Sequence, residues 1–142
     1  MNGAAPRGVT RGAAASGASM DRTLFVVGAA FALVGVAAGA FGAHGLEGRV
    51  PAERLATFET GVRYQMYHAF ALMLVAMAVT RWPDALLHAA GWLFVGGIVI
   101  FAGTLYGLTF GGPRWLGAIT PLGGLSFLAG WALVIAGVLR AR

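Results

Sequence analysis

Four long apolar stretches dominate this sequence, and they restrict what the chain can fold into. They lie at about 24–43, 64–80, 86–110 and 115–139, and charged residues, glycine or proline separate them. A helix of about 20 residues crosses the roughly 30 Å hydrocarbon core of a bilayer. Only 11% of the 142 residues are charged, whereas a typical soluble domain has about 25%. The sequence therefore predicts an all-α integral membrane protein with four transmembrane helices in an antiparallel bundle and the lipid bilayer as its partner.

The first 22 residues have a different composition. They are rich in glycine, alanine, serine and arginine and hold no apolar pattern that a core would bury. Residues 1–22 are therefore predicted to be a disordered N-terminal extension, ahead of a four-helix membrane domain at 23–142. Because Met20 directly precedes the first apolar stretch, a further hypothesis is that translation starts there rather than at Met1.

A polar connection at 44–63 joins the first two stretches. Pro51 suits the first turn of a helix, because its missing N–H is not needed there. Leu55, Phe58 and Val62 then fall on one side at helical spacing. The pattern predicts a short interfacial helix between spans one and two, running into the second span.

The charge pattern concerns orientation and partners. The net charge is +5, all from arginine, and the sequence has neither lysine nor cysteine. The side with both termini carries Arg7, Arg11, Arg22, Arg81, Arg140 and Arg142, and the other side carries Arg49, Arg54, Arg63 and Arg114. The positive-inside rule thus favours cytoplasmic termini. The arginines flank apolar stretches and form no basic stripe with interleaved aromatics, so no nucleic-acid partner is expected.

Small residues recur along the spans at spacings that suit close helix packing. Glycines separated by four residues, or repeated every seven, let two helix backbones approach each other in lipid. The expected packing positions are Gly35, Gly39, Gly42, Gly103, Gly107, Pro121, Gly123, Gly124 and Gly130. Packing within the bundle and formation of a homo-oligomer through these glycine faces are both open at this point. A proline inside the fourth span also predicts a kink or a new helix start there.

The polar residues of the spans gather in one half of the membrane. The stretch GAFGAHGLEG (39–48) ends the first span with His44 among glycines, and the alternating direction of the spans brings other polar groups to the same side. Polar groups at membrane depth are costly unless they are paired. The predicted polar cluster or ligand site consists of His44, Tyr64, Gln65, His68, Tyr106 and Thr120, with Glu59 at its mouth.

Several uses of this cluster are possible on the residues alone. It can hold the helices together, bind a ligand or substrate, or hold a metal or haem through histidines and a carboxylate. Catalysis has the least support, because the sequence contains no nucleophile motif, phosphate-binding loop or HExxH motif. The histidine spacing matches no metal motif, so no catalytic residue, metal ligand or cofactor is assigned.

Four motifs resemble a known family. GAFGAHGL (39–46), TGVRYQMYHAFAL (60–72), GTLYGL (103–108) and TPLGGLSFLAGWAL (120–133) are similar to the YgdD-like bacterial inner-membrane proteins, domain of unknown function 423, and to transmembrane protein 256. The resemblance implies a small four-helix protein of the bacterial inner membrane without an established activity. The motif residues that it carries over are Gly39, Gly42, His44, Gly45, Tyr64, Gln65, His68, Tyr106, Thr120, Pro121, Gly123 and Gly124.

These observations lead to one functional expectation and two alternatives. We expect an uncharacterised multi-pass inner-membrane protein that acts as a structural or binding module and is not an enzyme. The alternatives are an oligomeric conduit for a small solute or ion, and a metal- or haem-binding membrane subunit.

Overall fold

The structure, a computed structural model, describes residues 19–141. Its elements are α1 (Arg22–Phe41), the π-helical turn η1 (Gly42–Leu46), α2 (Ala52–Arg81), α3 (Ala85–Thr109) and α4 (Leu116–Arg140). The four long helices, the first extended by η1, are each long and apolar enough to cross a membrane. The predicted all-α fold with four membrane spans is confirmed. Residues 1–18 of the N-terminal extension lie outside the described part of the chain, so the predicted disorder of 1–22 stays a prediction.

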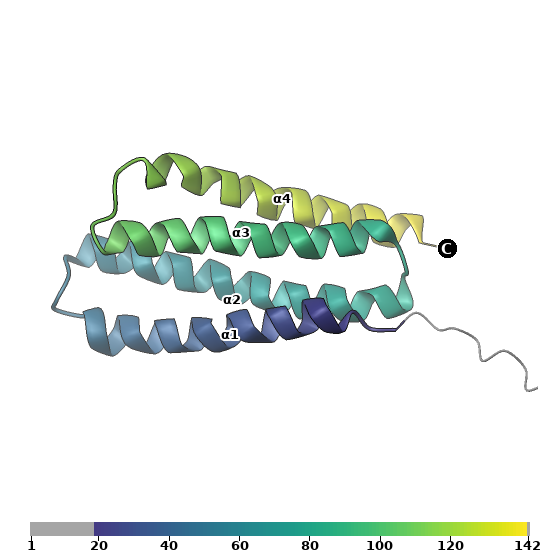
Figure 1. Cartoon of the computed structure of the whole chain (residues 1–142), viewed down its shortest axis with the longest axis horizontal. Helices are drawn as coiled ribbons and strands as arrows, with labels where there is room; N and C mark the ends of the chain where they lie inside the picture. The colour runs from purple at the N-terminus through teal and green to yellow at the C-terminus, as the bar shows by residue number, and fades with distance from the viewer. Residues whose placement is uncertain (1–18, 142) are drawn as a thin grey trace, which may run out of the picture.

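The helices are arranged so that each packs on the next one in the sequence. The extensive interfaces are those of α1 with α2, α2 with α3, and α3 with α4. Figure 1 shows the helices running antiparallel, with the beginning of α1 and the end of α4 at the same end of the bundle. The backbone of α4 packs closely on α3, and α4 reaches α2 only through side chains such as Phe127 and Trp131, which contact His68.

Polar caps fix where two helices begin. Asp21 accepts a hydrogen bond from the Leu24 backbone N–H at 3.1 Å at the start of α1, and Asp84 accepts one from Leu86 N–H at 2.8 Å at the start of α3. His88 on α3 also donates from Nδ1 to Asp21 Oδ2 over 2.9 Å. Burial by itself raises the pKa of Asp21, but the Leu24 N–H and His88 outweigh it and hold this pKa below its ordinary value. The contact ties the start of α1 to α3.

The polar connection does not contain the separate interfacial helix that the sequence predicted. After Pro51 the chain enters α2 at Ala52 and continues without interruption to Arg81, a helix of 30 residues. No proline follows Pro51 within this helix, and Phe58 is buried under the end of α1, so nothing separates the amphipathic turns from the span. At 1.5 Å per residue α2 is about 45 Å long, which exceeds the bilayer core of about 30 Å.

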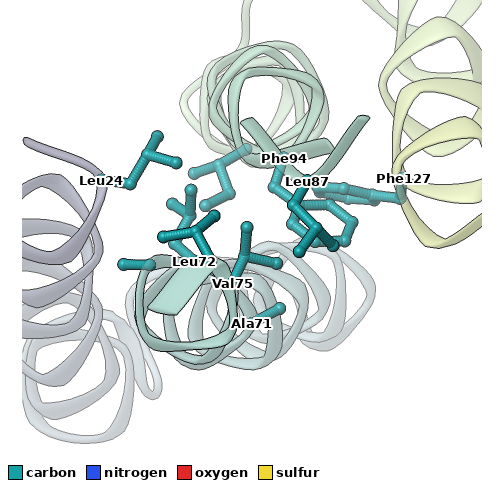
Figure 2. Packing of buried hydrophobic residues seen from close by; sticks show 10 residues of the cluster. Leu24, Ala71, Leu72, Val75, Leu87, Phe94 and Phe127 are labelled. Carbon is teal, nitrogen blue, oxygen red and sulfur yellow. The ribbon is translucent and has the colours of Figure 1, made fainter. Parts of the chain in front are cut away.

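The core lies between the helices at the end that holds the termini and extends to the middle of the bundle. Figure 2 shows Leu24 of α1 and Phe127 of α4 on opposite sides of the cluster, with Leu72 of α2 and Leu87 and Phe94 of α3 between them. All five are buried, so every helix contributes to one apolar cluster.

Glycines permit the close approach of α3 and α4. A Cβ atom on Gly123 would lie 2.6 Å from the backbone nitrogen of Phe101, and one on Gly130 would lie 2.5 Å from the ring of Phe94. Real side chains do not approach this closely, so larger residues at these positions would push the two helices apart. A Cβ on Gly35 would clash with the Met66 side chain and one on Gly107 with that of Leu116, whereas one on Gly42 would make a tight contact of 3.2 Å with the Phe58 ring.

The other predicted packing positions behave differently. A Cβ on Gly39 would make only ordinary contact with Val62 at 3.5 Å, and one on Gly124 would come no nearer than 4.0 Å to the Phe101 ring. Gly103 has nothing within 4 Å of such an atom, so it makes no close helix contact within the described chain, and its use in a homo-oligomer stays a prediction. Pro121 is exposed in the second turn of α4, and the helix continues past it instead of starting anew.

Candidate functional site

The most deeply placed ionisable side chain of the predicted cluster is His68. It follows the start of α2 by 16 residues and precedes Arg81 by 13, which leaves about 24 Å and about 20 Å of helix on its two sides. The side chain is 5% exposed. The sequence predicted a histidine near one membrane surface. Because α2 begins at Ala52 and not near Tyr64, His68 lies near the middle of the helix instead.

Two hydrogen bonds determine the chemical form of this imidazole. Nδ1 lies 2.8 Å from the backbone oxygen of Tyr64, and the indole Nε1–H of Trp131 donates to Nε2 over 3.3 Å. A carbonyl oxygen only accepts and an indole N–H only donates. The Nδ1 atom therefore carries the proton, and Nε2 is the acceptor of a neutral ring.

Aromatic rings from three helices surround His68. Its ring is stacked on Phe127 of α4, with centroids 3.5 Å apart and planes 8° apart, and Phe94 of α3 lies at 5.4 Å. Gly97 on α3 leaves room for the Phe127 ring, since a Cβ there would lie 2.5 Å from it. Phe127 and Trp131 were not among the predicted site residues. Their signal was spacing: they are four residues apart and so share a face of α4.

Gln65 forms a second polar centre that joins three helices. Its amide nitrogen donates to the backbone oxygen of Phe31 on α1 at 2.8 Å, and its amide oxygen accepts from the Tyr106 hydroxyl of α3 at 2.9 Å. Gln65 is 3% exposed, so both bonds lie away from the surface. The predicted proximity of Gln65 and Tyr106 is present in the structure.

Thr120 belongs to a different contact from the one predicted. Its hydroxyl lies 2.8 Å from that of Thr104 on α3. Because a hydroxyl has one proton, one threonine donates to the other, and the accepting threonine donates to a carbonyl of its own helix. This pair links α3 to α4 but does not reach Gln65 or His68 directly.

His44 and Glu59 lie outside the polar centres that the sequence predicted. His44 is exposed, because Gly42 and Leu46 form the buried side of η1 and a residue midway between them faces away. Glu59 is exposed beside a separate hollow of about 210 Å³ that Gly39 and Arg63 also line. Tyr64 is exposed as well, and its backbone oxygen rather than its hydroxyl contacts His68.

A groove opens between α2 and α4, beside the contacts that Phe127 and Trp131 make with His68. This α2–α4 groove has a volume of about 610 Å³. Its walls are Tyr64, His68, Phe101, Pro121, Gly124, Leu125, Phe127, Leu128 and Trp131. Four aromatic rings and the edge of the imidazole line the groove, so its surface is mostly apolar. The sequence predicted the polar members but not the groove itself.

Metal coordination has no matching arrangement in residues 19–141. No three histidine, aspartate or glutamate side chains come together in this range. Both nitrogens of His68 are already engaged in hydrogen bonds. His44 and His68, which the sequence placed in one cluster, lie apart, since the first is exposed just after α1 and the second is buried in the middle of α2.

Comparisons with known proteins place the chain among membrane proteins of unknown function. The model of the family described as "Protein of unknown function (DUF423)" matches residues 38–124. The chain is 42% identical over 120 residues to UPF0382 membrane protein YwdK of Bacillus subtilis, covering 84% of this chain and 98% of the relative. It is 41% identical over 114 residues to UPF0382 membrane protein SH2409 of Staphylococcus haemolyticus, covering 80% and 93%. No solved structure matches.

Proposed function

The chain belongs to the DUF423 family of membrane proteins, and we propose that it is a binding module whose α2–α4 groove takes up an apolar molecule dissolved in the bilayer. The observation that carries this proposal is the ring-lined groove with a buried histidine in its wall. Ionisable side chains at membrane depth are costly and usually serve a function. The groove volume of about 610 Å³ falls within the range of roughly 300–1,000 Å³ that small-molecule sites have.

The remaining polar contacts support a structural role beside the binding role. Gln65 and Tyr106 hold α1, α2 and α3 together, and Thr104 with Thr120 holds α4 to α3. Such interhelical hydrogen bonds contribute roughly 0.6–2 kcal/mol each in membranes. These contacts fix the walls of the groove while leaving its mouth open to lipid.

The location and orientation of the chain complete the proposal. We place it in the bacterial cytoplasmic membrane with both termini cytoplasmic, as the arginine distribution favours. The chain has no cysteine, so single-cysteine variants report cleanly. A membrane-impermeant maleimide added to intact cells should label Ala52→Cys and spare Ala141→Cys. The reverse pattern would place the termini outside. The conduit and the metal- or haem-binding subunit stay alternatives that no contact described above favours.

Contact quenching of Trp131 tests the groove. In lipid nanodiscs, a protein that keeps Trp131 but carries Trp82→Phe, Trp92→Phe and Trp115→Phe would be titrated with 1-bromo-4-dodecylbenzene, whose bromine quenches indole fluorescence on contact. A protein that keeps only Trp92 gives the baseline for exposure to lipid. Trp92 is exposed and does not line the groove. The two tryptophans lie at similar distances from the end of the bundle that holds the termini: Trp92 lies about 11 Å along α3 from Ala85, and Trp131 lies about 14 Å along α4 from Arg140.

Saturable quenching of Trp131 that exceeds the Trp92 baseline is the expected result. Unbrominated dodecylbenzene should reverse it by competition. Gly124→Leu fills the groove from its wall, where 4.0 Å separates the new Cβ from the nearest atom, and should return Trp131 to the baseline. Gly103→Leu is the matched control on another open surface and should change nothing. Linear, unsaturable quenching equal to that of Trp92 would overturn the proposal.

A further inference from the structure

The groove offers one hydrogen-bonding atom of defined polarity. His68 Nδ1 is held by the Tyr64 carbonyl oxygen at 2.8 Å, so this end of the ring is fixed as a donor within α2. The atom that remains, Nε2, is an acceptor. A molecule that forms a hydrogen bond with Nε2 must therefore bring a donor.

Trp131 occupies this acceptor in the structure, but through a weak contact. Its N–H···N distance of 3.3 Å is beyond the usual N–H donor range of about 2.7–3.2 Å. The Trp131 side chain is 42% exposed and forms part of the groove wall. It sits on the lipid-facing side of α4, so it can turn toward lipid and release Nε2 to a stronger donor.

The walls define the rest of the ligand. Tyr64, Phe101 and Phe127 present ring faces and edges, which favour an aromatic ring in offset or edge-to-face contact. Leu125 and Leu128 continue the wall along α4 as plain hydrocarbon. The volume of about 610 Å³ accommodates a ring together with part of a chain.

We infer that the α2–α4 groove binds a lipid-soluble phenol or quinol, a hydroxylated aromatic ring with a long hydrocarbon chain, whose hydroxyl replaces the Trp131 indole at His68 Nε2. This inference rests on the proposed function and names the chemical class of its ligand. A phenolic O–H is more acidic than an indole N–H and forms shorter hydrogen bonds, so the exchange strengthens the hydrogen bond to His68. The ring enters between the aromatic walls, and the chain lies along Leu125 and Leu128.

Competition between matched molecules tests the ligand class. 4-Dodecylphenol and its methyl ether, 1-dodecyl-4-methoxybenzene, differ only in the donor. Each would compete with 1-bromo-4-dodecylbenzene for the Trp131-only protein in nanodiscs. One net hydrogen bond corresponds to roughly tenfold in affinity. Because the phenol exchanges the weak Trp131 bond for a stronger one, it should compete better than the ether by up to about tenfold. Equal competition would overturn the donor assignment and leave the groove intact. Failure of both molecules to compete would overturn the groove as well.

Two variants separate a ligand contact from a purely structural effect. His68→Leu should remove the preference for the phenol while the ether still competes. Trp131→Phe removes the competing donor, so the phenol should bind more tightly than to the wild type. Because Trp131→Phe removes the fluorescent reporter, phenol binding to this variant would be followed by NMR of ¹⁵N-histidine-labelled protein. The Nε2 resonance of His68 should shift with the phenol and not with the ether. If His68→Leu does not fold, the wild-type pair of competitors and the Nε2 resonance still decide. An Nε2 resonance that ignores the phenol would contradict the inference.

Discussion

Replacing Gly123 by alanine is the sharpest perturbation of the contact that positions α4. The added Cβ would lie 2.6 Å from the backbone nitrogen of Phe101, 2.8 Å from its Cβ and 2.9 Å from its Cα. Two of these three atoms belong to the backbone of α3, which cannot move aside as a flexible side chain does. The helices must therefore separate, and overpacking of this kind costs about 1–3 kcal/mol. Alanine gains up to about 1 kcal/mol over glycine in a helix, which offsets part of the cost.

The same change at Gly103 provides the reference. A Cβ there meets nothing within 4 Å, so Gly103→Ala gains the helix propensity without the clash. Because the propensity gain is common to both variants, their difference isolates the close contact at about 1–3 kcal/mol. Reversible unfolding in mixed micelles of mild detergent and SDS, followed by circular dichroism, measures it. Two variants of equal stability, within about 0.5 kcal/mol, would refute the close approach of α3 and α4.

Three further predictions concern the polar contacts. Tyr106→Phe leaves the Gln65 amide oxygen without its donor and should lower the free energy of unfolding in the same micelles by roughly 0.6–1.7 kcal/mol; no loss would mean that the bond does not form in lipid. Thr104→Val should destabilise less in a Thr120→Val background than alone, and strictly additive losses in this double-mutant cycle would deny the contact. Asp21 has a lowered pKa in the folded chain, so its stabilising effect is present above its ordinary pKa of 3.8 and is lost as the pH falls through the lowered value. Asp21→Asn keeps a capping side chain and should flatten this acid dependence in thermal unfolding, whereas an unchanged pH profile would contradict it.

The membrane fold follows from the sequence because hydrocarbon restricts the solutions. A span must satisfy all of its backbone hydrogen bonds internally, so an apolar stretch of about 20 residues is a helix wherever it lies in the chain. The interfacial segment was harder to assign. Amphipathic spacing shows which side of a helix is buried, but it does not show whether that helix ends before the next span. In the structure Phe58 is buried and the helix has no break before Arg81, so the amphipathic segment and the second span form one helix.

The polar site could be predicted in part. Gln65 and His68 are polar residues within a span, so they had to be buried with partners, and they are. His44 looked equivalent in sequence, but it lies at a helix end, where a polar side chain can face outward at little cost. Its glycine neighbours allow both directions. The structure shows that His44 faces outward, because Gly42 and Leu46 form the buried side of η1.

The groove itself was beyond sequence reasoning. Trp131 carried no site signal in the sequence, although it lies nine residues before Arg140 and therefore well inside the span. Which face of α4 contacts α3 depends on how glycines fit opposing rings, such as Gly130 against Phe94. Gly103 carries the same GxxxG spacing as the packed glycines and still faces open space. Spacing identifies the positions where close packing is possible, and the partner helix determines which of them are used.

The most direct test of the account is the titration of the Trp131-only protein with 1-bromo-4-dodecylbenzene in nanodiscs. The expected result is saturable quenching that exceeds that of the Trp92-only protein, is lost in Gly124→Leu and is kept in Gly103→Leu. Quenching that rises linearly with the probe and is the same in all four proteins would show that the α2–α4 groove holds no more than bulk lipid, and it would contradict the central claim.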